Sequence, residues 1–291
     1  MTELPYPQSP RVTERGPLKE AGKPTLYYRW APAGPSRGTV LILHGMNEHS
    51  GRYEHVMDHL AQEGFSSLAI DYRGWGMAEG KRACLKSFDE YVQDALRGLS
   101  MARRRKGEDE PLFLLGHSQG GLLAARTAME EGTGLSGLIL SAPAIGIGVE
   151  VPAYKRVLAA LASKLVPDLS LPSDIPLEWL TQDPEMLSWA SKDPLMPGIG
   201  TARWFTETRR TQALVLSGAA SITIPTLFLI AGDERLVSNE ANRAFRDLLG
   251  GNEPAWIEYP GLRHEVFNEV EREQVLRDLT DWAKSLASVA G

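Results

Sequence analysis

The sequence contains a single cysteine, Cys84, among its 291 residues. One cysteine cannot form a disulfide within the chain, so the fold must be held by buried apolar side chains, and the composition suits a reducing compartment. The first ten residues are polar and rich in proline, and they contain no apolar core of signal-peptide length. No apolar run elsewhere has the length that a membrane-spanning helix needs. We therefore expect a cytoplasmic protein.

The sequence also lacks an excess of basic residues. Lys and Arg total 31 against 37 Asp and Glu, which gives a formal net charge of −6. Domains that bind nucleic acid carry a basic face, so a nucleic-acid partner is not expected. The one dense basic run, residues 103–106, ends a predicted helix, where positive charge interacts favourably with the helix dipole.

Motifs that hold metals or cofactors are missing as well. The chain has no cluster of metal ligands with the usual spacing and no loop typical of phosphate binding. Gly74-Trp75-Gly76 lacks the third glycine and the helix of a dinucleotide fingerprint. We expect a protein that needs neither a metal nor a cofactor.

Short apolar runs alternate with helical patterns along most of the chain. This alternation predicts an α/β fold with a mostly parallel central sheet flanked by helices, in which ligands bind beyond the carboxyl ends of the strands. Residues 1–10 are expected to form a loose tail before a hairpin. The predicted strands are 11–19, 25–30, 39–43, 67–70, 112–115, 138–141, 225–230 and 255–259.

One segment, residues 144–212, breaks this alternation. It is rich in proline and carries short apolar helical pieces, of which residues 154–166 are the clearest. We interpret it as a helical cap inserted after the sixth strand, which divides the chain into 1–143 (core), 144–212 (cap) and 213–291 (core). Its apolar side chains are expected mostly to pack the cap onto the core, with some lining a pocket: Ile145, Ile147, Val149, Val151, Leu158, Leu161, Trp204 and Phe205.

The strand at 112–115 leads into Gly116-His117-Ser118-Gln119-Gly120 and then into a helix. This Gly-x-Ser-x-Gly turn is typical of a nucleophile elbow, in which a strained turn exposes a serine at the start of a helix. Ser118 is therefore the candidate nucleophile. Its chemistry would require N–H donors for an oxyanion, and the backbone amides of Gln119 and Met46 are placed to supply them.

A serine hydroxyl needs a neighbouring base, and the base needs an acid to hold it. His264 follows the last predicted strand, where a chain order of serine, acid and histidine places the base. Asp233 and Glu234 both follow the preceding strand. Neighbours in an extended segment point in opposite directions, so only one of these carboxylates can face the imidazole.

Several motifs together resemble the monoacylglycerol lipase and lysophospholipase group of α/β-hydrolases. They are His44-Gly45-x-x-Glu48-His49-Ser50-Gly51-Arg52-Tyr53, Asp71-x-Arg73-Gly74-x-Gly76-x-x-Glu79-Gly80, Gly116-His117-Ser118-x-Gly120-Gly121, Ser141-Ala142-Pro143 and Gly261-x-x-His264-Glu265. The resemblance runs from about residue 27 to the last helix and is weakest in the cap. It implies an α/β-hydrolase fold and cofactor-free hydrolysis of lipid monoesters, with the acyl chain beneath an apolar cap.

The resemblance also implies residue roles. Ser118 would be the nucleophile and His264 the base, and the amides of Met46 and Gln119 would form the oxyanion hole. The family's acid is usually an aspartate directly before a segment like residues 235–237, a position that Glu234 occupies here, so Glu234 is favoured over Asp233. The substrate is expected to contact the first motif through Gly45, Asn47, Glu48, His49 and Arg52.

Other activities fit the same motifs. A short-chain carboxylesterase, a thioesterase or an acyltransferase would use the same site, and a non-catalytic binding protein of the hydrolase fold is the alternative from another class. The expected partner is a small lipid ester. Transient contact between the cap and a membrane surface is also open, since such substrates partition into bilayers. The motifs carry no signature of an oligomeric state, of acyl length or of the alcohol.

Overall fold

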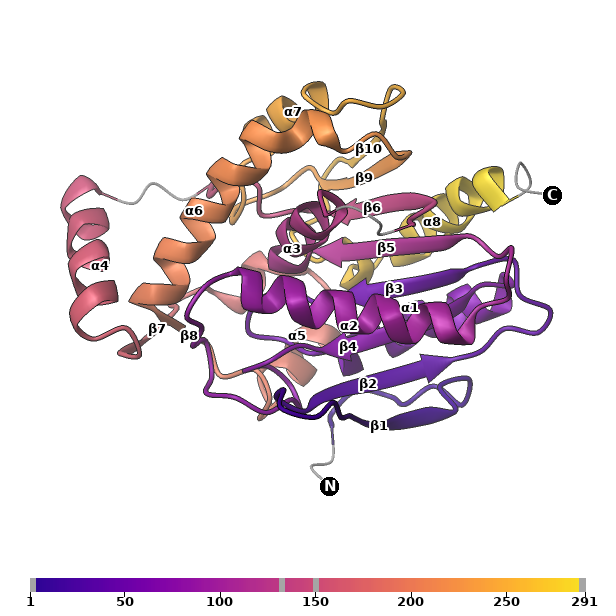
Figure 1. Ribbon diagram of the computed structural model, residues 1–291, viewed down its shortest axis with the longest axis horizontal. Coiled ribbons are helices and arrows are strands. Elements are labelled where there is room, and N and C mark those ends of the chain that lie inside the picture. Colours follow the sequence, from indigo (N-terminus) through magenta and orange to yellow (C-terminus); the bar gives the residue numbers. More distant parts are fainter. Residues whose placement is uncertain (1–3, 131–133, 149–151, 288–291) are drawn as a thin grey trace.

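The computed structural model describes residues 4–130, 134–148 and 152–287, and its centre is a sheet of eight strands in the order β1-β2-β4-β3-β5-β6-β9-β10. β1 and β2 pair antiparallel, as do β2 and β4, and the remaining neighbours are parallel (Figure 1). The strands are β1 (Glu14–Leu18), β2 (Leu26–Ala31), β3 (Thr39–Leu43), β4 (Ser66–Asp71), β5 (Leu112–His117), β6 (Gly137–Ser141), β9 (Thr226–Ala231) and β10 (Ala255–Tyr259).

The predicted α/β-hydrolase fold is confirmed, and the central strands show why it forms. Every residue of β3, β4, β5, β6 and β9 is buried, as expected for parallel strands covered on both faces. β1 and β10 form the opposite edges of the sheet and are more exposed. The carboxyl ends of the parallel strands meet at one edge, where the loops after β3, β4 and β5 begin.

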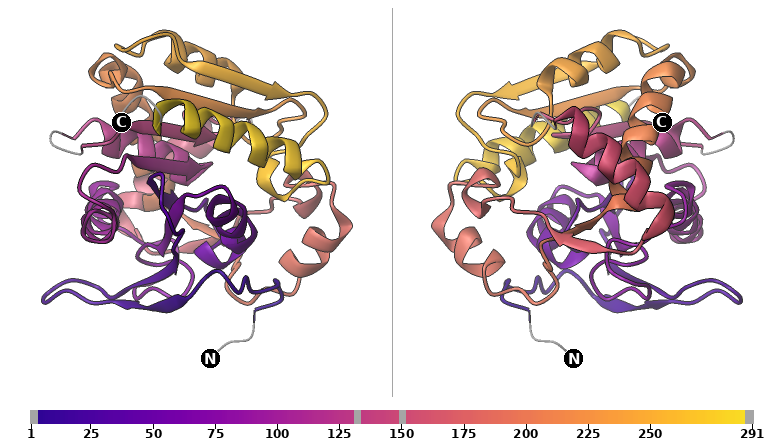
Figure 2. Two further views of the ribbon diagram at one scale, coloured as in Figure 1. Left: turned by 90° about the vertical axis from the view of Figure 1, so that its right-hand side faces the viewer. Right: turned by 90° about the vertical axis from the view of Figure 1, so that its left-hand side faces the viewer.

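Helices cover both faces of this sheet. One apolar core contains side chains of α2 (Asp89–Arg105), α3 (Gln119–Ala128) and α7 (Asn239–Asp247). The other contains side chains of α1 (Glu54–Gln62) and the C-terminal helix α8 (Arg272–Ala287), which Figure 2 shows in yellow along the sheet. The basic run at 103–106 does end α2. In the described part of the chain, no helix combines the length and the hydrophobicity needed to cross a membrane.

Between β6 and β9 the described residues form, besides two short 3-10 helices, α4 (Ala153–Leu165), β7 (Ser170–Pro172), α5 (Pro184–Ala190), β8 (Ile199–Thr201) and α6 (Ala202–Gly218). They lie beyond the end of the sheet toward which β5 points, with α4 at the far left of Figure 1. α4 packs along α6, and the hydroxyl groups of Ser163 and Thr206 are 2.9 Å apart across that contact. The expected cap boundary at residue 212 falls inside α6.

The expectation that the apolar cap residues mostly pack onto the core is wrong for α4. Ile145 is buried in the core, but Leu158 and Leu161 are 59% and 51% exposed. They belong to a row of exposed apolar side chains, because α4 packs mainly along α6 and these side chains are left uncovered. Val149 and Val151 lie outside the described residues. The row comprises Tyr154, Val157, Leu158, Leu161, Leu165, Val166, Leu169 and Leu171.

The tail expected to be loose is anchored at Tyr6, which is 7% exposed. Its ring makes edge contacts with His49 of the core and Trp189 of α5, and its hydroxyl accepts a hydrogen bond from Arg52 Nε at 3.0 Å. An isolated polar, proline-rich tail has no reason to order. Here one aromatic side chain has a pocket between the cap and the core, which the local sequence did not reveal.

Candidate active site

Ser118 lies at the sharp turn between β5 and α3, with φ 51° and ψ −118°. A non-glycine residue with such angles is strained and is held only by its surroundings. The two flanking glycines permit the turn. A Cβ at Gly116 would lie 2.1 Å from the Gly120 carbonyl oxygen, and one at Gly120 would lie 2.2 Å from the Leu43 oxygen. The turn therefore requires glycine at both positions, and it presses α3 against the end of β3.

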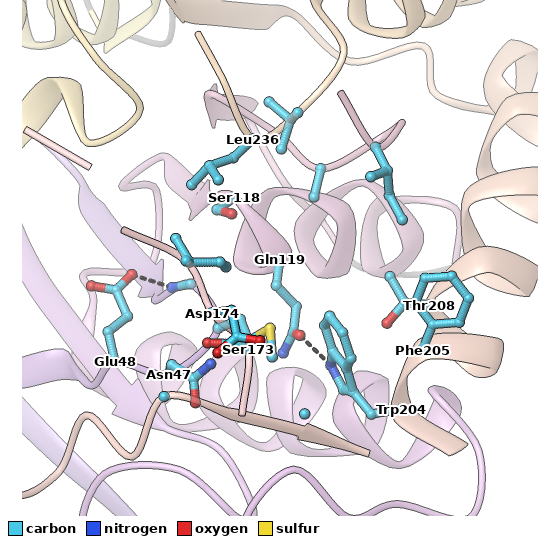
Figure 3. Close-up of a pocket in the computed structure, with 18 of the residues that line it drawn as sticks. Asn47, Glu48, Ser118, Gln119, Ser173, Asp174, Trp204, Phe205, Thr208 and Leu236 are labelled. Atoms are coloured by element: carbon cyan, nitrogen blue, oxygen red, sulfur yellow. Dashed lines mark hydrogen bonds between the residues drawn. The ribbon is translucent and has the colours of Figure 1, made fainter. Parts of the chain in front are cut away.

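A cavity of about 1020 Å³ opens above this turn and lies between the sheet edge and the cap. Ser118 and His264 both line it, together with Gly45, Met46 and Asn47 from the loop after β3. The cap supplies much of the remaining wall, including Leu158 of α4, the strand β7 and three residues of α6 shown in Figure 3: Trp204, Phe205 and Thr208. The candidate residues from distant parts of the sequence thus share one cavity.

The structure brings Glu234 and His264 together and leaves Asp233 apart. His264 Nδ1 lies 2.8 Å from Glu234 Oε2, and the two side chains are 4% and 2% exposed. The other oxygen of Glu234 accepts the backbone N–H groups of Leu236, at 2.8 Å, and Val237. Asp233 points to solvent and pairs with Arg235 at 2.8 Å.

Glu234 and His264 stabilise each other's charged form. Burial disfavours the imidazolium form of His264, but the neighbouring Glu234 carboxylate outweighs burial and raises the pKa of His264 above its usual value. Burial likewise disfavours ionised Glu234, yet His264 and the two N–H donors lower its pKa. The acid is therefore ionised at neutral pH and stabilises positive charge on the imidazole. A third group, His117, is buried and its pKa falls to about 3, so it stays neutral beside His264.

The amides expected to bind an oxyanion come from two segments, the start of α3 and the loop after β3. Gln119 opens α3, so its N–H has no acceptor within the helix and carries the positive end of the helix dipole. Met46 lies in the loop after β3 and lines the cavity. Asn47, with φ 58°, tightens that loop, and its side-chain oxygen accepts the Ile199 N–H of β8 at 3.0 Å.

Three residues expected to contact substrate have other partners. Arg52 is buried behind the cavity wall and binds both oxygens of Glu265, at 2.6 and 2.7 Å, and Glu48 at 2.9 Å. Glu48 lines the cavity, but its carboxylate also accepts the Gly45 N–H (Figure 3). The same carboxylate accepts the Tyr53 hydroxyl at 2.8 Å. His49 is buried and pairs with Asp193 at 2.7 Å. His49 and Arg52 are thus corrected from substrate contacts to structural groups, since their polar atoms are taken up inside the protein.

Arg52 connects two parts of the site that the sequence did not link. Glu265 follows His264 directly, and Glu48 holds the N–H of Gly45, next to Met46. One guanidinium therefore bridges the loop that carries His264 and the loop that carries Met46. Burial opposes ionisation of Glu265, but Arg52 lowers the pKa of Glu265 to about 2. Glu265 stood within the motif His264-Glu265, yet adjacency alone did not indicate its partner.

A half-buried serine at a strained turn and a buried imidazole–carboxylate pair at the same cavity are groups that can carry out acyl transfer. Within residues 4–130, 134–148 and 152–287, no group of three or more His, Cys, Asp or Glu is arranged to hold a metal ion. The sheet topology and this elbow define an α/β-hydrolase.

Comparison with known proteins identifies the family. Residues 34–271 match the family described as Hydrolase_4, serine aminopeptidase S33, and the chain belongs to it. It is 31% identical over 271 residues to a monoacylglycerol lipase of Mycolicibacterium smegmatis, covering 89% of this chain and 92% of the relative. It is 28% identical to phospholipase YtpA of Bacillus subtilis, covering 82% and 92%. Among solved structures, Paleococcus ferrophilus monoacylglycerol lipase superposes with a TM-score of 0.81 at 27% identity, covering 90% and 98%.

We predict that Arg52→Met destabilises the protein by about 3–5 kcal/mol, because it leaves two buried carboxylates without their cation. Urea unfolding followed by circular dichroism measures this free energy. Arg11→Met is the matched control: Arg11 is half-exposed and lies 3.6 Å from Asp58, so its loss should cost about 0–1 kcal/mol. Equal effects of the two substitutions would contradict the bridging role of Arg52.

Proposed function

We propose that this protein is a serine hydrolase that cleaves the carboxylic ester of lipid monoesters through an acyl-enzyme on Ser118. The observation that carries the proposal is the buried His264–Glu234 pair, whose imidazole lines the same cap-covered cavity as the strained Ser118. The family and the monoacylglycerol lipases among the relatives support it. A non-catalytic protein would have no need to hold a serine, a base and an acid in this arrangement.

In the proposed reaction, His264 Nε2 takes the proton of the Ser118 hydroxyl as Oγ attacks the ester carbonyl. Glu234 holds Nδ1 and stabilises the imidazolium that forms. The N–H groups of Met46 and Gln119 stabilise the oxyanion. Collapse breaks the bond to the alcohol, which leaves with the proton from His264. Water then attacks the acyl-enzyme by the same steps, and Ser118 and the fatty acid are released.

We predict that Glu234→Gln lowers kcat at least about 100-fold, because a neutral amide no longer stabilises the imidazolium. Asp233→Asn, a matched change at the adjacent and solvent-exposed carboxylate, should lower kcat less than about threefold. Hydrolysis of p-nitrophenyl butyrate measures both. Labelling by a fluorophosphonate should occur in the wild type and be absent in Ser118→Ala. A larger loss for Asp233→Asn, or no labelling of the folded wild type, would contradict the proposal.

The cavity favours an uncharged alcohol over a phosphate-bearing one. Its wall is mostly apolar, and its acidic side chains are Glu48, Asp174 and Glu265. No Lys or Arg stands among the described residues of the wall. A phosphate entering the cavity would lose water without gaining a cation and would meet like charge. We therefore propose monoacylglycerol-like esters as preferred substrates, ahead of lysophospholipids.

We predict that kcat/KM for a long-chain monoacylglycerol exceeds that for a lysophospholipid with the same acyl chain by about 100-fold or more. Product fatty acid, measured by mass spectrometry from mixed micelles, gives both values. A series of p-nitrophenyl esters from acetate to palmitate tests the acyl side. Faster turnover of the lysophospholipid would refute the neutral-alcohol proposal, and a strict preference for acetate would identify a short-chain carboxylesterase instead.

We also propose that the cap, the segment between β6 and β9, contacts membranes through α4. Val157, Leu161 and Leu165 of this helix are 60%, 51% and 76% exposed. Leu158 on the same helix is exposed and also forms part of the cavity wall, as do Leu169 and Leu171 after the helix. The exposed apolar surface is thus continuous with the cavity, which offers a lipid a path that stays out of water.

We predict that the double variant Leu161→Ser/Leu165→Ser binds phosphatidylcholine vesicles at least about tenfold more weakly than the wild type, since two leucines no longer enter the interface. Co-sedimentation measures the binding. Leu248→Ser is the control, because Leu248 is also 51% exposed but follows α7, outside the cap. Equal vesicle binding by all three proteins would rule out docking through α4.

A further inference from the structure

Trp204 of α6 contacts the site in two ways. Its ring lines the cavity, and its Nε1–H donates to Gln119 Oε1 at 2.5 Å (Figure 3). Gln119 directly follows Ser118, and its side chain is 2% exposed. A cap residue is therefore hydrogen-bonded to the residue whose backbone amide is a proposed oxyanion donor.

The contact continues into the core through Tyr72. Gln119 Nε2 donates to the Tyr72 hydroxyl at 2.9 Å. That hydroxyl has one proton, which it shares between the carbonyl oxygens of His44, at 3.1 Å, and Gly45, at 3.3 Å. Tyr72 is fully buried, and its ring stacks on His44 with 4.2 Å between centroids. An unbroken series of hydrogen bonds therefore runs from the Trp204 indole to the loop after β3.

The last link has a direct geometric consequence. The Gly45 carbonyl and the Met46 N–H belong to one planar trans peptide, so the two groups point in opposite directions. Holding the Gly45 oxygen therefore sets where the Met46 N–H points. His44 Nδ1 also lies 2.7 Å from that oxygen, and Asn47 binds β8, the strand that leads into α6. The corner formed by β8 and α6 thus holds the loop after β3 on two sides.

We propose that Trp204 is a positioning residue for ester hydrolysis: through Gln119 and Tyr72 its indole N–H holds the Gly45–Met46 peptide with the Met46 N–H toward the reacting carbonyl. This inference rests on the function proposed above. It extends that function by making the cap part of the catalytic geometry as well as a cover for the acyl chain. An acyl chain that touches the Trp204 ring contacts the same group that orders the oxyanion hole.

The test uses Trp204→Phe, which keeps an aromatic ring in the cavity and removes the N–H. With p-nitrophenyl acetate, whose acyl group is too short to fill the cap cavity, kcat should fall about tenfold while KM stays within about twofold. A role in packing or acyl binding alone would leave kcat for this ester unchanged. Trp256→Phe is the matched control, because its indole donates only at the surface, to Glu258. It should match the wild type.

A double-mutant cycle distinguishes one connected series of hydrogen bonds from contacts that act independently. Tyr72→Phe should lower kcat to a similar degree, and combining it with Trp204→Phe should add little, because either change already breaks the chain. Gln119→Met, which removes both side-chain hydrogen bonds and keeps the backbone amide, should reproduce the loss. If the wild type is active and Trp204→Phe leaves kcat unchanged, this inference alone is overturned. The same holds if the kcat losses of the two single variants multiply in the double variant. A wild type that hydrolyses no ester would overturn the proposed function with it.

Discussion

The close approach of α3 to the end of β3 is the constraint on which the site depends. It is possible only because Gly120 has no side chain, so that its Cα lies against the carbonyl oxygens of Leu43 and His44. This contact places the start of α3 beside the first residues after β3. The proposed nucleophile and both proposed oxyanion amides therefore lie together as a result of backbone packing, before any polar side chain is considered.

Buried polar groups then link the loops that this packing brings near. Arg52 joins the loop after β3 to the residue following His264, and Tyr72 joins the same loop to the start of α3. Buried charged and polar groups are costly unless they are paired or hydrogen-bonded, so each of these groups tolerates few arrangements of its neighbours. Such a network defines relative positions more narrowly than apolar contacts could, and accurate relative position is what acyl transfer requires.

The cap combines two kinds of structure. The corner of β8 and α6 is hydrogen-bonded to the core at Asn47 and Gln119, whereas α4 packs mainly along α6 and exposes an apolar row. Polar bonds to the core suit a part that sets geometry. An uncovered apolar face suits a part that meets lipid. The same insertion thus serves the proposed chemistry at one end and the proposed approach of substrate at the other.

The sequence by itself determined the succession of the eight central strands along the chain, the α/β-hydrolase fold and the identity of the elbow, because apolar periodicity and the requirement for glycine are local properties. It did not indicate the short cap strands β7 and β8. It also reduced the acid to Asp233 or Glu234. The family resemblance favoured Glu234, and the tertiary structure shows that Glu234 meets His264. The tertiary structure alone decided that Arg52 and His49 are internal ion-pair partners and that Tyr6 is anchored. These contacts join side chains from segments that are distant in the sequence, and one-dimensional patterns do not encode such pairings. The exposure of α4 has the same origin, since an amphipathic pattern indicates an apolar face but not whether anything covers it.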